Sequence, residues 1–216
     1  MMKGGNQNRD MKKEILDVQF LPYLSSDLDK WMNGDYSFIP ENVTDLDRMR
    51  VQEKAGERNN RYFGECIVLK KYSNQFIKSR YTHSFHWLYN DSWYDGNPKG
   101  QLQQEFNFDL EDYFPVPKLR IAQLKAREYI KKFGIKPSSP DVWLVAEYPK
   151  SWFIEVKKLN EERRKGQLPG LAIIAKYLKC KVSIYRIYSE NEEPKSKLAK
   201  SDKKEFQEIY QSLNTL

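Results

Sequence analysis

Residues 140–157 read PDVWLVAEYPKSWFIEVK, and this stretch decides the fold of the chain. Two largely apolar runs, 140–145 and 152–157, flank a short polar break at 146–151. Apolar runs of this length around such a break are typical of two strands joined in a β-hairpin. We therefore expect a pair of neighbouring strands here, with Asp141 at the start of the first.

Three ionisable side chains belong to this hairpin. Glu155 and Lys157 are two residues apart, so on a strand they project from the same face. Asp141 stands near the start of the other strand. Charges in an otherwise buried run cost free energy unless something compensates them. Two acids and one amine suit a site for Mg²⁺, which takes oxygen ligands and keeps water molecules that a phosphate can displace.

The pattern of these residues resembles the PD-(D/E)xK nuclease superfamily, and within it most closely the VRR-NUC group. In that group a glutamine at the start of a helix follows the lysine by ten positions, and Gln167 stands ten residues after Lys157. Apolar residues at helical spacing predict a helix over 168–178, and 182–187 is expected to form another strand. The resemblance implies an α/β protein with a restriction-endonuclease-like core, in the order helix, three-stranded meander, helix and strand.

The resemblance also implies roles for the residues that match it. Asp141, Glu155 and the backbone carbonyl of Val156 would hold Mg²⁺, for which Mn²⁺ would substitute. Lys157 would orient the attacking water or offset charge on the phosphate. Gln167 would support the site through hydrogen bonds.

Nucleases of this type open with a helix whose glutamate points toward the metal. Glu65, which follows Phe63 and Gly64 at the start of an aliphatic segment, matches that element and is expected to act as a catalytic and metal-side acid. Glu128 on a later predicted helix is the alternative. An acid at the edge of an apolar stripe that simply reaches solvent is the ordinary interpretation of Glu65.

We expect three regions along the chain. An accessory N-terminal helical extension is followed by the nuclease core, whose first strand is predicted at 81–89 and which is interrupted between its first and second strands. A charged linker and a terminal helix come last, with the helix predicted to begin near Ser201. The boundaries are 1–58 for the extension, 59–189 for the core with its insertion at 97–138, and 190–216 for the linker and helix.

The chain carries 37 basic and 30 acidic residues, a net charge of +7 that favours an anionic partner. Cations gather on the predicted helix 118–133 and at 163–165. Neutralising phosphates gives sequence-independent affinity for nucleic acid, although a solvated helix face is the ordinary alternative. The expected DNA-binding residues are Lys118, Arg120, Lys125, Arg127, Lys131, Lys132, Arg163, Arg164 and Lys165.

The sequence disfavours a disulfide-rich, zinc-binding, secreted or membrane protein. Cys66 and Cys180 are too few for a disulfide framework or a zinc site. His83 and His86 lie three apart on a predicted strand and would face opposite sides. The start of the chain does not match a signal peptide, and no apolar run is long enough to span a bilayer. We therefore expect a cytoplasmic protein with no membrane association.

The resemblance implies a Mg²⁺-dependent deoxyribonuclease, an endonuclease rather than an exonuclease, in repair, recombination or the processing of mobile-element or phage DNA. One alternative is an inactive nucleic-acid-binding or assembly module with the same fold. Another is an endonuclease of a restriction or transposition system. Stand-alone proteins that resemble this family often act as dimers, so a homodimer is a candidate assembly.

Overall fold

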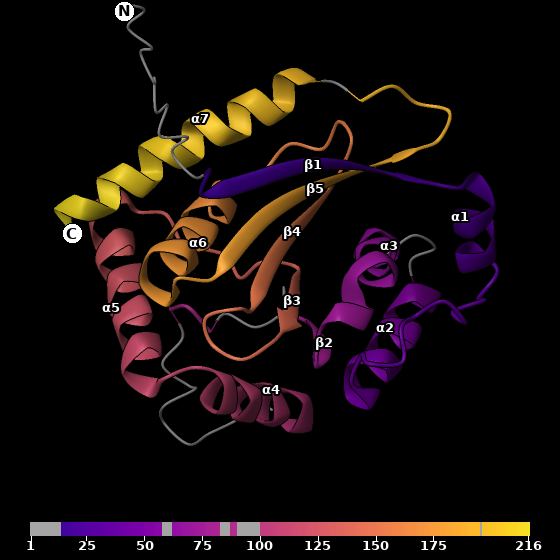
Figure 1. The fold of residues 1–216 in the computed structure, drawn as a ribbon, viewed down its shortest axis with the longest axis horizontal. Coiled ribbons are helices and arrows are strands. Elements are labelled where there is room, and N and C mark those ends of the chain that lie inside the picture. Colours follow the sequence, from indigo (N-terminus) through magenta and orange to yellow (C-terminus); the bar gives the residue numbers. More distant parts are fainter. Residues whose placement is uncertain (1–13, 58–61, 83–86, 90–99, 195) are drawn as a thin grey trace, which may run out of the picture.

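A five-stranded mixed sheet forms the centre of the molecule, with the strand order β1-β5-β4-β3-β2. The computed structural model describes residues 14–57, 62–82, 87–89, 100–194 and 196–216. Helices pack on both faces of the sheet (Figure 1). The described part of the chain is thus a mixed α/β protein with seven α-helices around one sheet.

The strands and helices alternate irregularly along the chain. The strands are β1 (Leu16–Tyr23), β2 (Lys78–Tyr81), β3 (Val142–Val145), β4 (Trp152–Lys158) and β5 (Lys181–Ser189). The helices are α1 (Ser25–Met32), α2 (Asp45–Glu57), α3 (Phe63–Tyr72), α4 (Gly100–Tyr113), α5 (Val116–Phe133), α6 (Gln167–Ile173) and α7 (Ser196–Ser212). A π-helical turn, Ile174–Leu178, continues α6.

The predicted hairpin is confirmed. β3 and β4 are antiparallel, with Val142 opposite Ile154. The Ser151 hydroxyl closes the connection, because it donates to the carbonyl of Ala146 (2.8 Å) and accepts from the amide of the same residue (3.2 Å). β2 pairs antiparallel with β3, and β5 lies parallel to β4 after the crossover through α6.

Two hydrophobic layers hold the sheet between the helices. On one face, here called the α6 side, Trp143 and Phe153 stack with their ring centroids 5.5 Å apart and pack with residues of α4, α5 and α6. On the other face, the α3 side, Ile154 and Val156 pack with residues of α2 and α3. Successive residues of β3 and β4 alternate between these layers, as the pleat of a strand requires.

The first strand of the meander lies earlier than predicted. β2 covers Lys78–Tyr81, whereas 87–89 form a turn and 83–86, which include both histidines, fall outside the described residues. Polar side chains obscured this strand in the sequence. Arg80 is fully buried and forms ion pairs with Asp47 (2.7 Å) and with Asp109.

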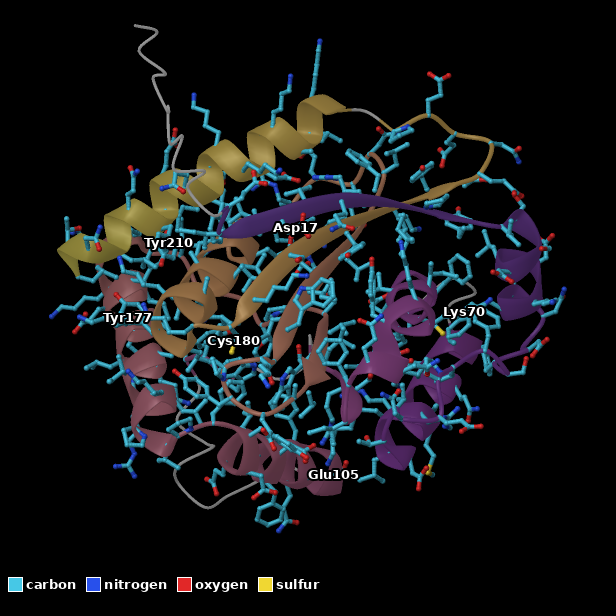
Figure 2. The ribbon with its side chains drawn as sticks, viewed as in Figure 1. Asp17, Lys70, Glu105, Tyr177, Cys180 and Tyr210 are labelled. Atoms are coloured by element: carbon cyan, nitrogen blue, oxygen red, sulfur yellow. The ribbon has the colours of Figure 1, made fainter. Side chains whose placement is uncertain are left out.

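The insertion between β2 and β3 contains two helices, of which α5 covers the predicted helix 118–133, whereas α4 was not predicted. Acidic residues of α4 form ion pairs with basic residues of β2. Glu105, labelled in Figure 2, lies 3.1 Å from the Arg80 guanidinium, and Asp109 also binds Lys78 (2.7 Å). These acids neutralise cations of the edge strand β2.

The expectation of a purely helical N-terminal extension is wrong. β1 joins the sheet as an edge strand parallel to β5, with Leu16 opposite Val182. The terminal helix α7 begins at Ser196, earlier than predicted, and lies along β1 (Figure 1). Both ends of the described chain therefore complete one edge of the sheet.

The two cysteines are free thiols in different layers of the core. Cys180, labelled in Figure 2, lies on the α6 side, and Cys66 lies on the α3 side. Burial raises the pKa of each thiol to about 12. Among the helices of the described residues, none has both the length and the apolar character needed to cross a membrane.

Candidate active site

Asp141 directly precedes β3, Glu155 and Lys157 lie on the neighbouring β4, and the three side chains meet at one end of these strands. Val142 pairs with Ile154, so one further step of the same register puts Asp141 opposite Glu155. Residues opposite one another in an antiparallel pair project from the same face. Lys157 follows two positions along β4 and points the same way. The predicted convergence of these three side chains is present.

Hydrogen bonds tie the group together. The amide of Val156 donates to Oδ2 of Asp141 (2.8 Å). Lys157 Nζ lies 2.8 Å from Oε1 of Glu155, and Nε2 of Gln167 donates to the same oxygen. Glu155 and Lys157 are only 1% and 5% exposed. The cluster therefore combines two carboxyl groups, one ammonium group and one amide, and most of it is out of contact with bulk water.

Gln167 begins α6 and is anchored on both sides of its amide. Its Oε1 accepts from the backbone amide of Arg164 (2.7 Å), while Nε2 reaches Glu155. Pro169 does not disturb this placement, because it lies in the first turn of the helix, where its missing N–H has no helical acceptor.

Two glycines near the start of α6 hold the segment before Asp141 against the helix. A Cβ on Gly166 would overlap the carbonyl oxygen of Lys136, and one on Gly170 would overlap that of Ser138. The amide of Ser138 also donates to the Gly166 carbonyl (2.8 Å). This close approach positions the chain that leads into Asp141. No role of these glycines was predicted from the sequence, although their spacing of four at a helix start was a usable signal.

The pKa values of Glu155 and Lys157 are both raised, for different reasons. Burial raises the pKa of Glu155 well above its ordinary value, and the charge of Asp141 and a hydrogen bond with that carboxyl raise it further. Burial alone would lower the pKa of Lys157, but Glu155 and Asp141 outweigh burial and raise it to about 12. Lys157 is therefore an ammonium ion at neutral pH.

Glu65 approaches this group from α3, on the other face of the sheet. Burial raises its pKa to about 8, and the charge of Asp141 acts in the same direction, whereas Lys157 lowers it. Glu65 is thus within electrostatic reach of the site. The alternative acid, Glu128, is instead bound to Lys125 (2.8 Å) on α5.

The donor set fits a magnesium ion held by few protein ligands. Within the described residues, no group of three or more His, Cys, Asp or Glu side chains is arranged to hold a metal. Mg²⁺ is, however, commonly bound through one or two carboxylates together with water and substrate oxygens. Asp141 and Glu155 supply such a pair. Val156, whose carbonyl was the predicted ligand, contributes its amide to Asp141.

The predicted DNA-binding cations differ in their surroundings. Arg163 is bound to Asp202 and to Glu205 (2.9 Å), so acids of α7 offset its charge. Lys125 and Lys132 contact the C-terminal residues Leu216 and Thr215. The exposed members are Lys118, Arg120, Arg127, Lys131, Lys132, Arg164 and Lys165.

A second buried ion network, not foreseen from the sequence, fixes the loop after β4. Arg186 on β5 is 1% exposed and binds Asp202 (3.1 Å). Its Nη1 also donates to the carbonyls of Leu159 (3.3 Å) and Glu161 (3.0 Å). The Glu161 carboxylate in turn lies 3.4 Å from Lys157 Nζ. A charge inside an apolar strand, the signal that singled out Glu155, also marked Arg186.

Replacing Gln167 with Ala is expected to destabilise the fold by about 1–3 kcal/mol, because the Arg164 amide loses its acceptor and Glu155 loses a donor. Urea unfolding of the metal-free protein measures this change. Gln207→Ala, at an exposed position of α7, is the matched control and should change stability by less than about 0.5 kcal/mol. Equal effects at both positions would contradict the bracing role of Gln167.

Comparison of the chain with protein-family models, with curated proteins and with solved structures found no match.

Proposed function

We propose that this protein is a metal-dependent nuclease that hydrolyses DNA phosphodiester bonds on a restriction-endonuclease-like core similar to that of the VRR-NUC group. One observation carries the proposal. Asp141, Glu155, Lys157 and Gln167 come from three separate elements and meet in one buried hydrogen-bonded group. The order of α3, the meander β2-β3-β4, α6 and β5 agrees with the arrangement that the resemblance implies.

Asp141 and Glu155 are the residues that would hold Mg²⁺. The charge of Asp141 opposes ionisation of the buried Glu155, and a divalent ion bound by both carboxyl groups would offset that repulsion further than Lys157 does. Bound there, the ion would polarise the scissile phosphate and lower the pKa of a coordinated water. Gln167 keeps the Glu155 carboxyl in place through its hydrogen bond.

Lys157 acts as a fixed positive charge next to the reacting phosphate. Its raised pKa keeps the ammonium group protonated, which suits charge stabilisation better than proton abstraction. Because the amine is buried against Glu155, it is preorganised and needs little rearrangement when charge develops on the phosphate. Glu65 would assist from α3 through water or a second ion.

The exposed cations of α5 and of the loop before α6 would neutralise the DNA backbone. Arg164 and Lys165 lie immediately before Gln167, on the chain segment that enters the site. Backbone contacts of this kind carry no sequence information. We therefore propose a structure-selective endonuclease rather than one that reads a base sequence.

A panel of linear, nicked, flapped and branched DNA, with an RNA control, tests the proposed function. Cleavage of at least one DNA is expected with Mg²⁺ or Mn²⁺ and none with EDTA. Ca²⁺, which is larger and coordinates more flexibly, should support binding better than cleavage. Binding without cleavage of any member would instead identify an inactive nucleic-acid-binding module.

Magnesium is expected to stabilise the fold through the same carboxylates. At a concentration about 100 times its Kd, a ligand of the folded state contributes about 2.7 kcal/mol, or roughly 5–10 °C in Tm for a chain of this size. Asp141→Asn should remove this shift, because it deletes one charge while still accepting from Val156. Thermal melts with and without Mg²⁺ measure it. A shift of equal size in both proteins would place the ion elsewhere.

A further inference from the structure

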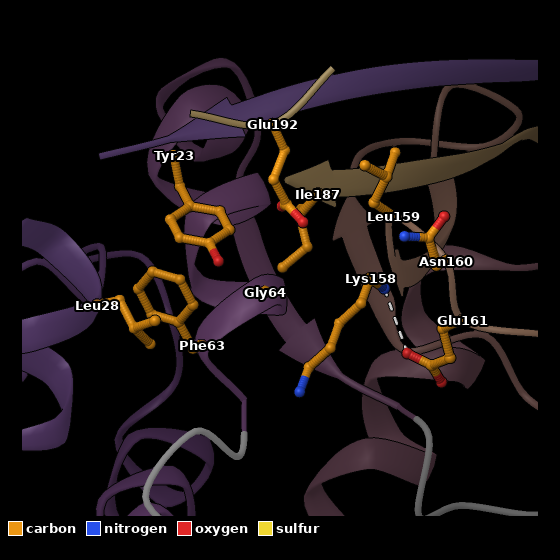
Figure 3. A pocket seen from close by; sticks show the side chains of 10 residues that line it. All are labelled: Tyr23, Leu28, Phe63, Gly64, Lys158, Leu159, Asn160, Glu161, Ile187 and Glu192. Carbon is orange, nitrogen blue, oxygen red and sulfur yellow. Dashed lines mark hydrogen bonds between the residues drawn. The ribbon is translucent and has the colours of Figure 1, made fainter. Parts of the chain in front are cut away.

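A pocket lies beside the candidate active site, on the α3 side of the sheet. It has a volume of about 370 Å³ and is formed where the ends of β1, β4 and β5 approach the start of α3. Its walls include Tyr23, Phe63, Gly64, Lys158, Glu161 and Glu192 (Figure 3). Its volume is within the range of small-ligand sites.

The pocket adjoins the site through shared residues. Glu161 forms part of its wall and also contacts Lys157 Nζ (3.4 Å). The same carboxylate accepts from the amide of Lys158 (3.2 Å) (Figure 3). Gly64 in the wall directly precedes Glu65. A group in this pocket would therefore be a near neighbour of a phosphate held at Asp141, Glu155 and Lys157.

The lining favours a flat, uncharged group with hydrogen-bond donors. Tyr23 and Phe63 supply two aromatic rings, packed edge to face with centroids 5.0 Å apart. Two carboxylates, Glu161 and Glu192, outnumber the single amine of Lys158 among the lining residues. This charge disfavours a phosphate, whereas the ring and amino groups of a nucleobase could stack on the aromatic rings and donate to the acids.

We propose that this pocket takes the base of an unpaired nucleotide next to the scissile phosphate, so that the preferred substrate is DNA with a single-stranded segment at the cut. The inference rests on the proposed nuclease function. A base within a duplex is stacked and paired and cannot enter a pocket without leaving the helix. An unpaired flap, end or bulge presents its base without that cost.

A second hollow of about 440 Å³ adjoins the pocket across Tyr23, which lines both. It carries Lys70, held 3.3 Å from Asp27, and the exposed Lys71. Asp27 and Glu190 also line this hollow, so its two amines are balanced by two carboxylates, and the exposed Lys71 is the amine that would meet the next phosphate of a strand leaving the pocket.

Binding of a flapped DNA with 2-aminopurine at the unpaired position tests the inference without metal, in EDTA. The wild-type protein should alter the fluorescence of this base, and removing the base to leave an abasic site should weaken binding about tenfold. Tyr23→Ala should weaken binding of the intact DNA by a similar factor. It should bind the abasic DNA as tightly as the wild-type protein does. Tyr188→Ala is the matched control, since Tyr188 is a half-buried tyrosine near the end of β5 that does not line the pocket.

Equal wild-type affinity for intact and abasic DNA would overturn the inference, and this comparison needs no variant to fold. The inference would also be overturned if the Tyr23→Ala protein lost as much affinity on removal of the base as the wild-type protein does. The Mg²⁺ cleavage assay on the same two DNAs separates the two proposals. Cleavage of both at equal rates would reject the base pocket and keep the nuclease, whereas no cleavage of any DNA would reject the nuclease itself.

Discussion

DNA cleavage by the Lys157→Ala variant is expected to fall about 100- to 1000-fold, while DNA binding is retained. The magnitude is that of removing one preorganised group that stabilises charge in a transition state. Lys157 is held by Glu155 and Glu161, so its charge is fixed before the substrate arrives. Single-turnover rates in Mg²⁺ and a separate binding titration measure the two quantities.

Two comparisons make this result specific to the site. Lys150→Ala removes an exposed amine from the connection between β3 and β4 and should leave the rate unchanged. Circular dichroism melts of Lys157→Ala identify any loss that comes from unfolding. A folded Lys157→Ala protein that cleaves at the wild-type rate would reject the catalytic role of this residue.

The second large effect concerns stability. Replacing Asp202 with Ala is expected to destabilise the fold by about 3–5 kcal/mol, or roughly 10 °C in Tm. Asp202 is 1% exposed and binds both Arg186 and Arg163, so its removal leaves a buried guanidinium without its carboxylate partner. Denaturant unfolding measures the loss.

Asp112→Ala, at an exposed position of α4, provides the control for this measurement and should change the free energy of unfolding by less than about 0.5 kcal/mol. A similar small effect for Asp202→Ala would contradict the structural role of the ion network. Because Arg186 also holds the carbonyls of Leu159 and Glu161, a destabilised Asp202→Ala protein should lose cleavage as well.

The sequence could predict those elements whose signal is local. The hairpin was predictable because apolar runs flank a polar break, and the spacing of Glu155 and Lys157 placed both on one face. The start of α6 followed from Pro169, which tolerates only the first turn of a helix. Each of these inferences needs only neighbouring residues.

Features that depend on distant partners were not predictable. β2 has a buried arginine whose partners Asp47 and Asp109 lie 33 and 29 residues away, so its sequence did not have the pattern of a core strand. The edge position of β1 depends on pairing with β5, more than 160 residues later. The pocket beside the site likewise combines the ends of strands that are far apart in sequence.

The position of a bound divalent ion tests the central claim most directly. Crystals of the wild-type protein soaked in Mn²⁺, which substitutes for Mg²⁺ and scatters anomalously, would reveal the ion. An anomalous peak between the carboxyl groups of Asp141 and Glu155, absent from Asp141→Asn crystals, is the expected result. No peak at this pair, or an unchanged peak in the variant, would contradict a metal site built on these two residues.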